Sequence, residues 1–285
     1  MSGASQETSE IFAPGMLADQ VALVTGGGTG LGKATAAELV RCGARVVIAG
    51  RREEVLRDAA SEIGERCSWV AGDIRDQTEA GRLVEDVMEH HGRLDLLVNN
   101  AGGQYFVPAE AISTKGWQAV WRLNVDGTTN MANAAFDGAM RAAGSGTIIN
   151  VTLSPHHGMP AMAHSGSARA AVEALTRELA QRWATDGISV MAIAAGHFDT
   201  EALDKYPDVV RAGTARSVPV GRLGGAQEHA WLVALLASPV GQAMNGATVT
   251  LDGARDNWFG PWPPPGLITE SGEVPTEERR KQSAD

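Results

Sequence analysis

The sequence predicts a single-domain α/β fold, with a doubly wound parallel sheet of about seven strands and helices on both faces. Short apolar runs rich in branched residues alternate with longer helix-prone segments through most of the chain. These helix-prone segments are long enough to serve as crossovers, which makes neighbouring strands parallel. The chain has 285 residues, 44% of them hydrophobic, and an α/β domain of this size can form one core.

The first predicted unit is a strand at 21–24, a glycine-rich turn at 25–32 and a helix at 33–40. Glycine removes the Cβ atom that would hold a phosphate away from the backbone amides, and the positive end of the helix dipole favours an anion. A strand, a glycine turn and a helix in this order therefore predict a pyrophosphate site. We expect the site to use Gly26, Thr29, Gly30, Leu31 and Gly32.

The alternation continues to the end of the domain. Further strands are predicted at 44–49, 68–72, 94–98, 146–151, 188–194 and 247–251, and further helices at 53–63, 78–91, 113–143 and 165–185. We divide the chain into an N-terminal extension (1–17), one domain (18–254) and a tail (255–285) in which residues 258–265 are rich in tryptophan and proline.

Composition excludes several classes of function. No apolar run approaches the ~20 residues that span a bilayer, and the polar first ten residues do not resemble a signal peptide, so we expect no membrane association. The formal net charge of −10 argues against nucleic-acid binding. Cys42 and Cys67 lack metal-ligand spacing and are expected to be reduced structural residues of a cytoplasmic protein, and we predict no metal site.

The end of the second strand predicts the cofactor. An NAD enzyme usually places a carboxylate there for the ribose 2′-hydroxyl, but this chain has Gly50 followed by Arg51 and Arg52. A glycine leaves room for a 2′-phosphate, and a guanidinium can bind that phosphate through two hydrogen bonds. We therefore expect NADPH. Alternatively, the two arginines simply begin a solvated helix.

Asp73-Ile74 after the third strand and Asn99-Asn100-Ala101-Gly102 after the fourth resemble the short-chain dehydrogenase/reductase family over residues 11–254, which implies a Rossmann-type fold. Gly102-Gly103-Gln104 and His164 to Ala170 are similar to the trans-2-enoyl-CoA and 2,4-dienoyl-CoA reductase branch, which reduces a double bond conjugated to a thioester. The resemblance implies cofactor contacts from Asp73, Ile74, Asn100, Ala101, Gly102, Arg169, Phe198 and Thr200.

The chain departs from the family at its catalytic Tyr-x-x-x-Lys, where Ser165 and Arg169 stand instead. Carbonyl reduction needs an acid beside the carbon that accepts the hydride, whereas enoyl reduction moves charge to a distant thioester oxygen that hydrogen-bond donors can stabilise. Arg169 can bind the nicotinamide ribose, but it stays protonated and cannot shuttle protons.

Several residues could be the donors. Asn124 matches the family's active-site asparagine and either contacts the enolate or props a helix kink and binds water. Ser154 either donates to substrate or caps a turn, and Ser165 is expected mainly to cap a helix. Tyr105 could supply a phenol but is expected to form an aromatic wall.

Residues near the predicted catalytic mouth include four histidines, at positions 156, 157, 164 and 197, and one of them could titrate near neutrality as a donor. Tyr206 is expected in the segment that covers the substrate.

Three functions remain open. They are an NADPH-dependent reductase of an enoyl or dienoyl thioester, a carbonyl or alcohol oxidoreductase with an unusual proton donor, and a cofactor-binding protein with little turnover. The expected partner is a small-molecule substrate such as an acyl-CoA thioester. The helix at 113–143 and the aliphatic face from Ala168 to Leu179 are expected to form a homodimer or homotetramer interface, or else to face the core.

Overall fold

A seven-stranded parallel sheet organises the protein, as predicted. The computed structural model describes residues 8–154, 156, 161–201, 203 and 213–257, and its strands are ordered β3–β2–β1–β4–β5–β6–β9. The strands are β1 (Val21–Thr25), β2 (Arg45–Gly50), β3 (Cys67–Ala71), β4 (Leu96–Asn99), β5 (Gly146–Leu153), β6 (Ile188–Ala195) and β9 (Thr248–Leu251). Strand order reverses between β1 and β4, and in open α/β sheets a ligand crevice forms at such a point.

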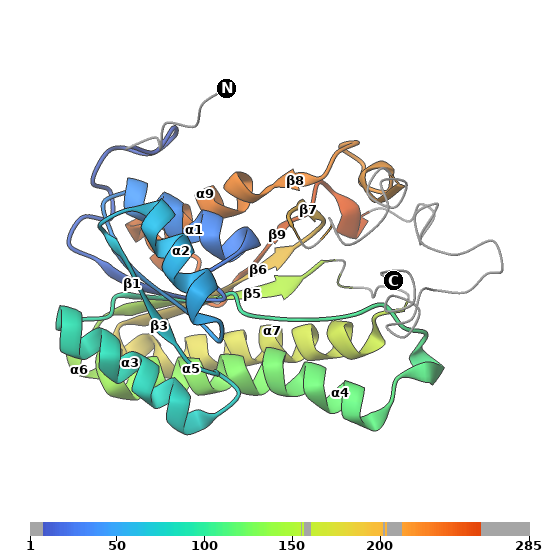
Figure 1. The fold of residues 1–285 in the computed structure, drawn as a ribbon, viewed down its shortest axis with the longest axis horizontal. Coiled ribbons are helices and arrows are strands. Elements are labelled where there is room, and N and C mark those ends of the chain that lie inside the picture. Colours follow the sequence, from blue (N-terminus) through green and yellow to red (C-terminus); the bar gives the residue numbers. More distant parts are fainter. Residues whose placement is uncertain (1–7, 155, 157–160, 202, 204–212, 258–285) are drawn as a thin grey trace.

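Helices cover both faces of the sheet (Figure 1). On one face lie α1 (Gly30–Arg41), α2 (Glu53–Ile63) and α9 (Ala226–Ala237), and on the other lie α3 (Gln77–His91), α4 (Thr114–Trp121), α5 (Gly127–Ala135) and α7 (Ala163–Trp183). Successive residues of β1 point to opposite faces, because Ala22 and Val24 pack with the first helix layer and Val21 and Leu23 with the second. The sheet therefore has a hydrophobic core on each face.

The helix predicted at 113–143 is continuous but contains two π-helical turns, Arg122–Asp126 and Phe136–Met140, and ends as α6 (Arg141–Ala143). Single π-turns inside α-helices are frequent at functional sites. Thr128 and Thr129 each donate a hydroxyl to the carbonyl four residues earlier, next to the first π-turn. The turn at Arg122–Asp126 carries Asn124.

Several short elements were not predicted from the sequence. β7 (Phe198–Asp199) pairs in parallel with β8 (Gly224–Gly225) as a separate two-stranded sheet. The other short elements are α10 (Pro239–Gln242) and the 3₁₀ turns Ala109–Ala111, Ala184–Asp186 and Arg255–Asn257. Within the described ranges, no helix combines the length and apolar character needed to cross a membrane.

The aliphatic face of α7 belongs to the core of a single chain. Ala168 and Val172 are fully buried, and Leu179 is 8% exposed. Of the two roles considered for this face, the core-facing one is confirmed for these three residues, so the expectation that they form a subunit interface is wrong. Cys42 and Cys67 are both buried and unpaired, as expected of structural thiols.

Candidate active site

A cleft of about 580 Å³ lies at the carboxyl ends of the central strands, where the crevice was expected. It is formed by the glycine turn after β1 and by the segments after β2, β3, β4, β5 and β6. Its lining includes most residues that the sequence predicted for the cofactor: Gly26, Thr29, Gly30, Leu31, Arg51, Arg52, Asp73, Ile74, Asn100, Ala101, Gly102, Arg169 and Thr200.

The glycine turn has the geometry of a phosphate cradle. Gly26 and Gly30 have φ angles of +66° and +53°, which favour glycine, and α1 begins at Gly30. Gly32 is absent from the cleft lining and has a packing role, because a Cβ atom there would lie 2.3 Å from the carbonyl oxygen of Gly26. These glycines let the backbone approach a ligand and let the helix pack against the turn.

Asn100 joins this turn to the loop after β4. Its side-chain amide donates to the carbonyl oxygen of Thr25 at 2.9 Å and to that of Gly26 at 3.3 Å. The Thr25 hydroxyl accepts the backbone N–H groups of Asn100 and Ala101 at 3.1 and 3.0 Å. Two segments about 75 residues apart thereby form one rigid floor.

The end of the cleft beside β2 and β3 carries the predicted arginines. Arg51 and Arg52 are exposed beside Gly50, which leaves a basic edge. Asp73 accepts from Arg75, whose Nε lies 2.8 Å from one carboxylate oxygen. The hydrogen bonds from Arg75 lower the pKa of Asp73, and Arg51 adds a smaller effect of the same sign. The sequence analysis missed Arg75, although its position two residues after Asp73 is a detectable signal.

Arg169 is a buried cation in the wall of the cleft. Its Nη1 donates to the Val151 carbonyl oxygen at 2.7 Å, and its Nη2 lies beside Gly102, where a Cβ atom would be 2.1 Å away. Nε has no hydrogen-bond partner among the described residues, and burial is the one influence on the pKa of Arg169, with no effect from a described carboxylate. Burial lowers the pKa of the guanidinium to about 10, so it remains charged at neutral pH.

Asn124 is positioned to hold the backbone and not to meet a ligand. It is fully buried, and its Nδ2 donates to Val120 O at 2.7 Å and Gly103 O at 2.9 Å, while its Oδ1 accepts from Gly103 N at 3.2 Å. Both amide protons are therefore used within the protein. This geometry favours the second of the two roles considered for Asn124, support of the helix, and leaves no free amide proton for an enolate.

Two predicted serines donate elsewhere. Ser165 lies inside α7, which begins at Ala163, so the expected capping role is wrong; its hydroxyl donates to Gln104 Oε1 at 2.9 Å. Ser154 is fully buried and donates to the carboxylate of Asp252, so neither a turn cap nor a donor facing the cleft describes it. Leu153 lines the cleft next to it.

The structure places two of the predicted aromatic residues, Tyr105 and Phe198, outside the lining of the cleft. Tyr105 meets the buried ring of His164 edge-on, with centroids 4.5 Å apart, and its hydroxyl lies beside Gly116 of α4. Phe198 was expected to contact cofactor, but its ring packs in the core against Gly224 and His229. Tyr206, His157 and residues 258–265 lie outside the described residues.

Comparison with known proteins identifies the family. A model of the family described as enoyl-(acyl carrier protein) reductase matches residues 26–254. The chain is 35% identical over 256 residues to a peroxisomal 2,4-dienoyl-CoA reductase of Arabidopsis thaliana, which covers 85% of this chain and 86% of that protein. A probable 2,4-dienoyl-CoA reductase of Bacillus subtilis is 35% identical over 249 residues, covering 85% and 97%.

A solved structure agrees. The citronellol catabolism dehydrogenase of Pseudomonas aeruginosa PAO1 superposes with a TM-score of 0.79 at 37% identity, covering 88% of this chain and all of that one. The chain belongs to the short-chain dehydrogenase/reductase family.

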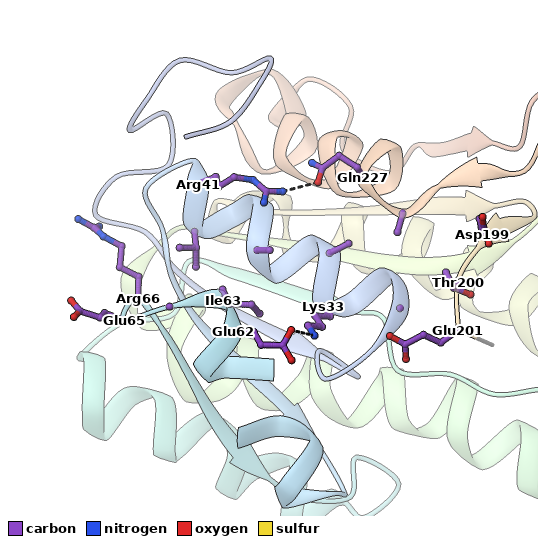
Figure 2. Close-up of a pocket in the computed structure, with 16 residues that line it drawn as sticks. Lys33, Arg41, Glu62, Ile63, Glu65, Arg66, Asp199, Thr200, Glu201 and Gln227 are labelled. Atoms are coloured by element: carbon purple, nitrogen blue, oxygen red, sulfur yellow. Dashed lines mark hydrogen bonds and ion pairs between the residues drawn. The ribbon is translucent and has the colours of Figure 1, made fainter. Parts of the chain in front are cut away.

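This short-chain dehydrogenase/reductase has a second, larger cavity of about 830 Å³ over the outer face of α1. Figure 2 shows two contacts among its lining side chains: Lys33 forms an ion pair with Glu62 at 2.6 Å, and Arg41 donates to Gln227 at 2.6 Å. The larger cavity shares Gly30 and Thr200 with the cleft, but the described residues of the loop after β4 do not line it. We place the chemistry of this enzyme in the smaller cleft.

Proposed function

We propose that this protein is an NADPH-dependent reductase of a carbon–carbon double bond conjugated to a thioester, such as an enoyl- or dienoyl-CoA. The observation that carries the proposal is the state of the hydroxyl groups at the catalytic positions. Ser165 and Ser154 donate to Gln104 and Asp252, and the cleft lining includes Leu153 and the charged Arg169.

The residues of the cleft fit a nicotinamide dinucleotide. The glycine turn leaves room for the pyrophosphate, and a Cβ atom at Gly26 or Gly32 would meet neighbouring backbone within 3.0 Å. When bound, a reduced nicotinamide supplies the hydride. Arg51 and Arg52 would bind the 2′-phosphate, and Thr200, which packs over Gly30, would lie near the nicotinamide end.

Arg169 supports an anionic or polarised ligand. A buried cation that lacks a carboxylate partner is costly, and a ligand oxygen beside its Nη2 would offset part of that desolvation. The guanidinium would position the cofactor ribose and add positive potential where negative charge develops in the substrate. It cannot be the acid, because it holds its proton too firmly.

The pattern of donors favours an enoyl substrate over a ketone. A ketone needs an acid next to the carbon that receives the hydride, and the residue in the tyrosine column, Ser165, is an unactivated hydroxyl that donates to Gln104. A conjugated thioester instead develops an enolate whose α-carbon can take its proton from a separate group. Asn124 contributes by holding the Gly103 loop, a positioning role.

A carbonyl or alcohol oxidoreductase is the second candidate. The similarity to a solved citronellol catabolism dehydrogenase supports it. It would require a proton donor other than the Ser165 column.

The test is consumption of NADPH with matched panels of 2-enoyl-CoA, 2,4-dienoyl-CoA and ketone substrates, with products identified by mass spectrometry. We expect kcat/KM for at least one thioester to exceed the kcat/KM of every ketone by about 100-fold or more, which is the rate enhancement that one well-placed acid or base provides. Ser165→Ala should cost at most about 1 kcal/mol on that substrate, the net value of one neutral hydrogen bond. Turnover of ketones or alcohols alone, abolished by Ser165→Ala, would establish the second candidate.

A further inference from the structure

His156 lies between two carboxylates contributed by distant parts of the chain. Its Nδ1 is 2.7 Å from Asp256 Oδ2 in the C-terminal 3₁₀ turn, and its Nε2 is 3.0 Å from Glu173 Oε1 on α7. Its backbone N–H also donates to Asp256 Oδ1 at 2.6 Å. Both ring nitrogens therefore face hydrogen-bond acceptors, an arrangement that suits the doubly protonated imidazolium.

This group connects to the cleft through one side chain. The Thr152 hydroxyl donates to Glu173 Oε1 at 2.9 Å, the same oxygen that His156 contacts, and Thr152 lines the cleft at the end of β5. The exposed fraction of the side chain is 32% for His156, compared with 11% for Glu173. The row Thr152–Glu173–His156 thus leads from the cleft to a side chain that solvent reaches.

We propose that His156 is the proton source of the active site and that it acts through Glu173 and the hydroxyl of Thr152. The inference rests on the proposed function. A bound reduced nicotinamide dinucleotide would supply the hydride to the substrate alkene, with its own oxidation, and the electron pair of the C=C bond would move onto the thioester oxygen as an enolate. When the enolate collapses, the Thr152 hydroxyl turns from Glu173 Oε1 toward the α-carbon and gives it its proton.

Three proton transfers return the row Thr152–Glu173–His156 to its starting protonation state. The Thr152 oxygen takes a proton from Glu173, which has taken the Nε2 proton of the His156 imidazolium, and the imidazole left behind is reprotonated by solvent. One proton enters for each hydride consumed, so charge balances. In this scheme Thr152 is the catalytic residue, while Glu173 and His156 act through it.

The charges around His156 favour its protonated form. Burial lowers its pKa, but the hydrogen bond to Asp256 and the charge of Glu173 outweigh burial, and the pKa is raised above the usual histidine value. Asp252 is linked to Asp256 by a further hydrogen bond. It accepts from Asp256 N at 2.6 Å and from the Ser154 hydroxyl. Arg255 is a buried cation next to Asp252, and His197 has a pKa lowered to about 4 by burial and by Arg255, so it stays neutral.

The cluster around His156 lacks the geometry of a metal site, since no group of three His, Cys, Asp or Glu residues in the described ranges could hold a metal ion. A purely structural link between the β5 loop and the C-terminal turn would stabilise the fold but leave no titration in the rate. The pH profile therefore separates a proton source from a structural link.

The experiment measures kcat against pH with saturating NADPH and substrate for four variants. We expect His156→Gln and Thr152→Val each to lower kcat by about 100-fold, as loss of acid catalysis does, and to remove the fall in rate that the unaltered enzyme shows as pH rises through the His156 pKa. The matched control His90→Gln, which alters an exposed histidine near Asp86, should stay within about twofold and keep the fall in rate with pH. Thr152→Ser, which keeps a hydroxyl, should recover most of the rate lost in Thr152→Val and show the same fall.

A measurement without substrate completes the test. The imidazole NMR signals of His156 in the unaltered protein should titrate above the usual histidine range, and Asp256→Asn should move that titration to lower pH. The proposal would be overturned if the kcat of His156→Gln still fell as pH rises, or if the His156 signals titrated at or below the usual histidine pKa. If no thioester is reduced, the proposed function fails first; the NMR result still decides whether His156 carries the proton, and any other substrate found serves for the pH profile.

Discussion

Gly102 determines where the buried guanidinium of Arg169 can lie. A Cβ atom at Gly102 would be 2.1 Å from Arg169 Nη2 and 2.8 Å from Asn124 Oδ1. Arg169 cannot move aside freely, because it is buried and donates to Val151 O at 2.7 Å. The absence of a side chain at this position is therefore part of the cleft.

We expect Gly102→Ala to displace Arg169 and to weaken the binding of NADPH by about tenfold or more (~1.4 kcal/mol). Overpacking should also lower the free energy of unfolding by about 1–3 kcal/mol. The control is Gly166→Ala in α7, where nothing lies within 4 Å of the added carbon and alanine should stabilise by about 0.5–1 kcal/mol. Fluorescence titration and thermal unfolding measure both. Equal cofactor binding in the two variants would show that Arg169 does not bind the cofactor.

Arg51 is the residue on which the preference for NADPH rests. Arg51→Ala should weaken NADPH by about 1.5–3 kcal/mol, the value of a charge-assisted hydrogen bond, and leave NADH nearly unchanged. Arg57→Ala, which removes an exposed arginine of the same helix region that does not line the cleft, is the control. Equal losses for both cofactors would contradict the assignment.

At the scale of elements, the π-turn Arg122–Asp126 ties the long helix to the loop after β4 through Asn124. A helix with regular hydrogen bonding would present this side chain differently. The turn therefore transmits the position of the helix to Gly103 and Gln104, which line the cleft.

Asn124→Ala should lower the unfolding free energy by about 3 kcal/mol, because it leaves the buried Val120 O and the partly buried Gly103 N and O without their side-chain partner, and a buried group left unpaired costs ~1–3 kcal/mol. We also expect KM to rise, since the Gly103 loop loosens. Asn133→Ala, at an exposed position of α5, should change neither quantity. If the Asn124→Ala protein were as stable as the unaltered protein and only its kcat fell, the direct enolate contact would be favoured over the positioning role.

At the scale of the whole molecule, the C-terminal turn closes the domain onto the β5 loop. Arg255 is 4% exposed and Asp256 contacts His156, so the turn Arg255–Asn257 packs against the domain. The Trp- and Pro-rich segment begins after this turn. A test of that segment must therefore leave the turn in place.

We expect a chain ending at Asn257 to have a lower melting temperature or to assemble less well than the full chain. The two tryptophans and the phenylalanine at 258–265 are costly to leave in water, so they should pack against protein. Light scattering and thermal unfolding measure this, with a homodimer or homotetramer expected for the full chain. A chain ending at Ala254 is the comparison and should lose further stability as the Asp256–His156 contact is removed. An unchanged size and melting temperature for the chain ending at Asn257 would show that the tail does not pack.

The sequence by itself determined the seven strands, the alternation of strand and helix that makes neighbouring strands parallel, and the phosphate cradle. These depend on local causes: glycine permits the φ angles at Gly26 and Gly30, and apolar periodicity selects strand or helix. The family and most of the cofactor cleft followed, because the motif residues lie on loops that the sheet brings to one edge.

Only the tertiary structure decided what the polar side chains touch. Ser154 meets Asp252, 98 residues away, and His156 meets Asp256, 100 residues away. Asn124 and Ser165 likewise donate to Gly103 and Gln104, partners that the motif did not indicate. A hydrogen-bond partner is selected by the packing of distant segments and by side-chain rotamers, and neither is encoded in local periodicity.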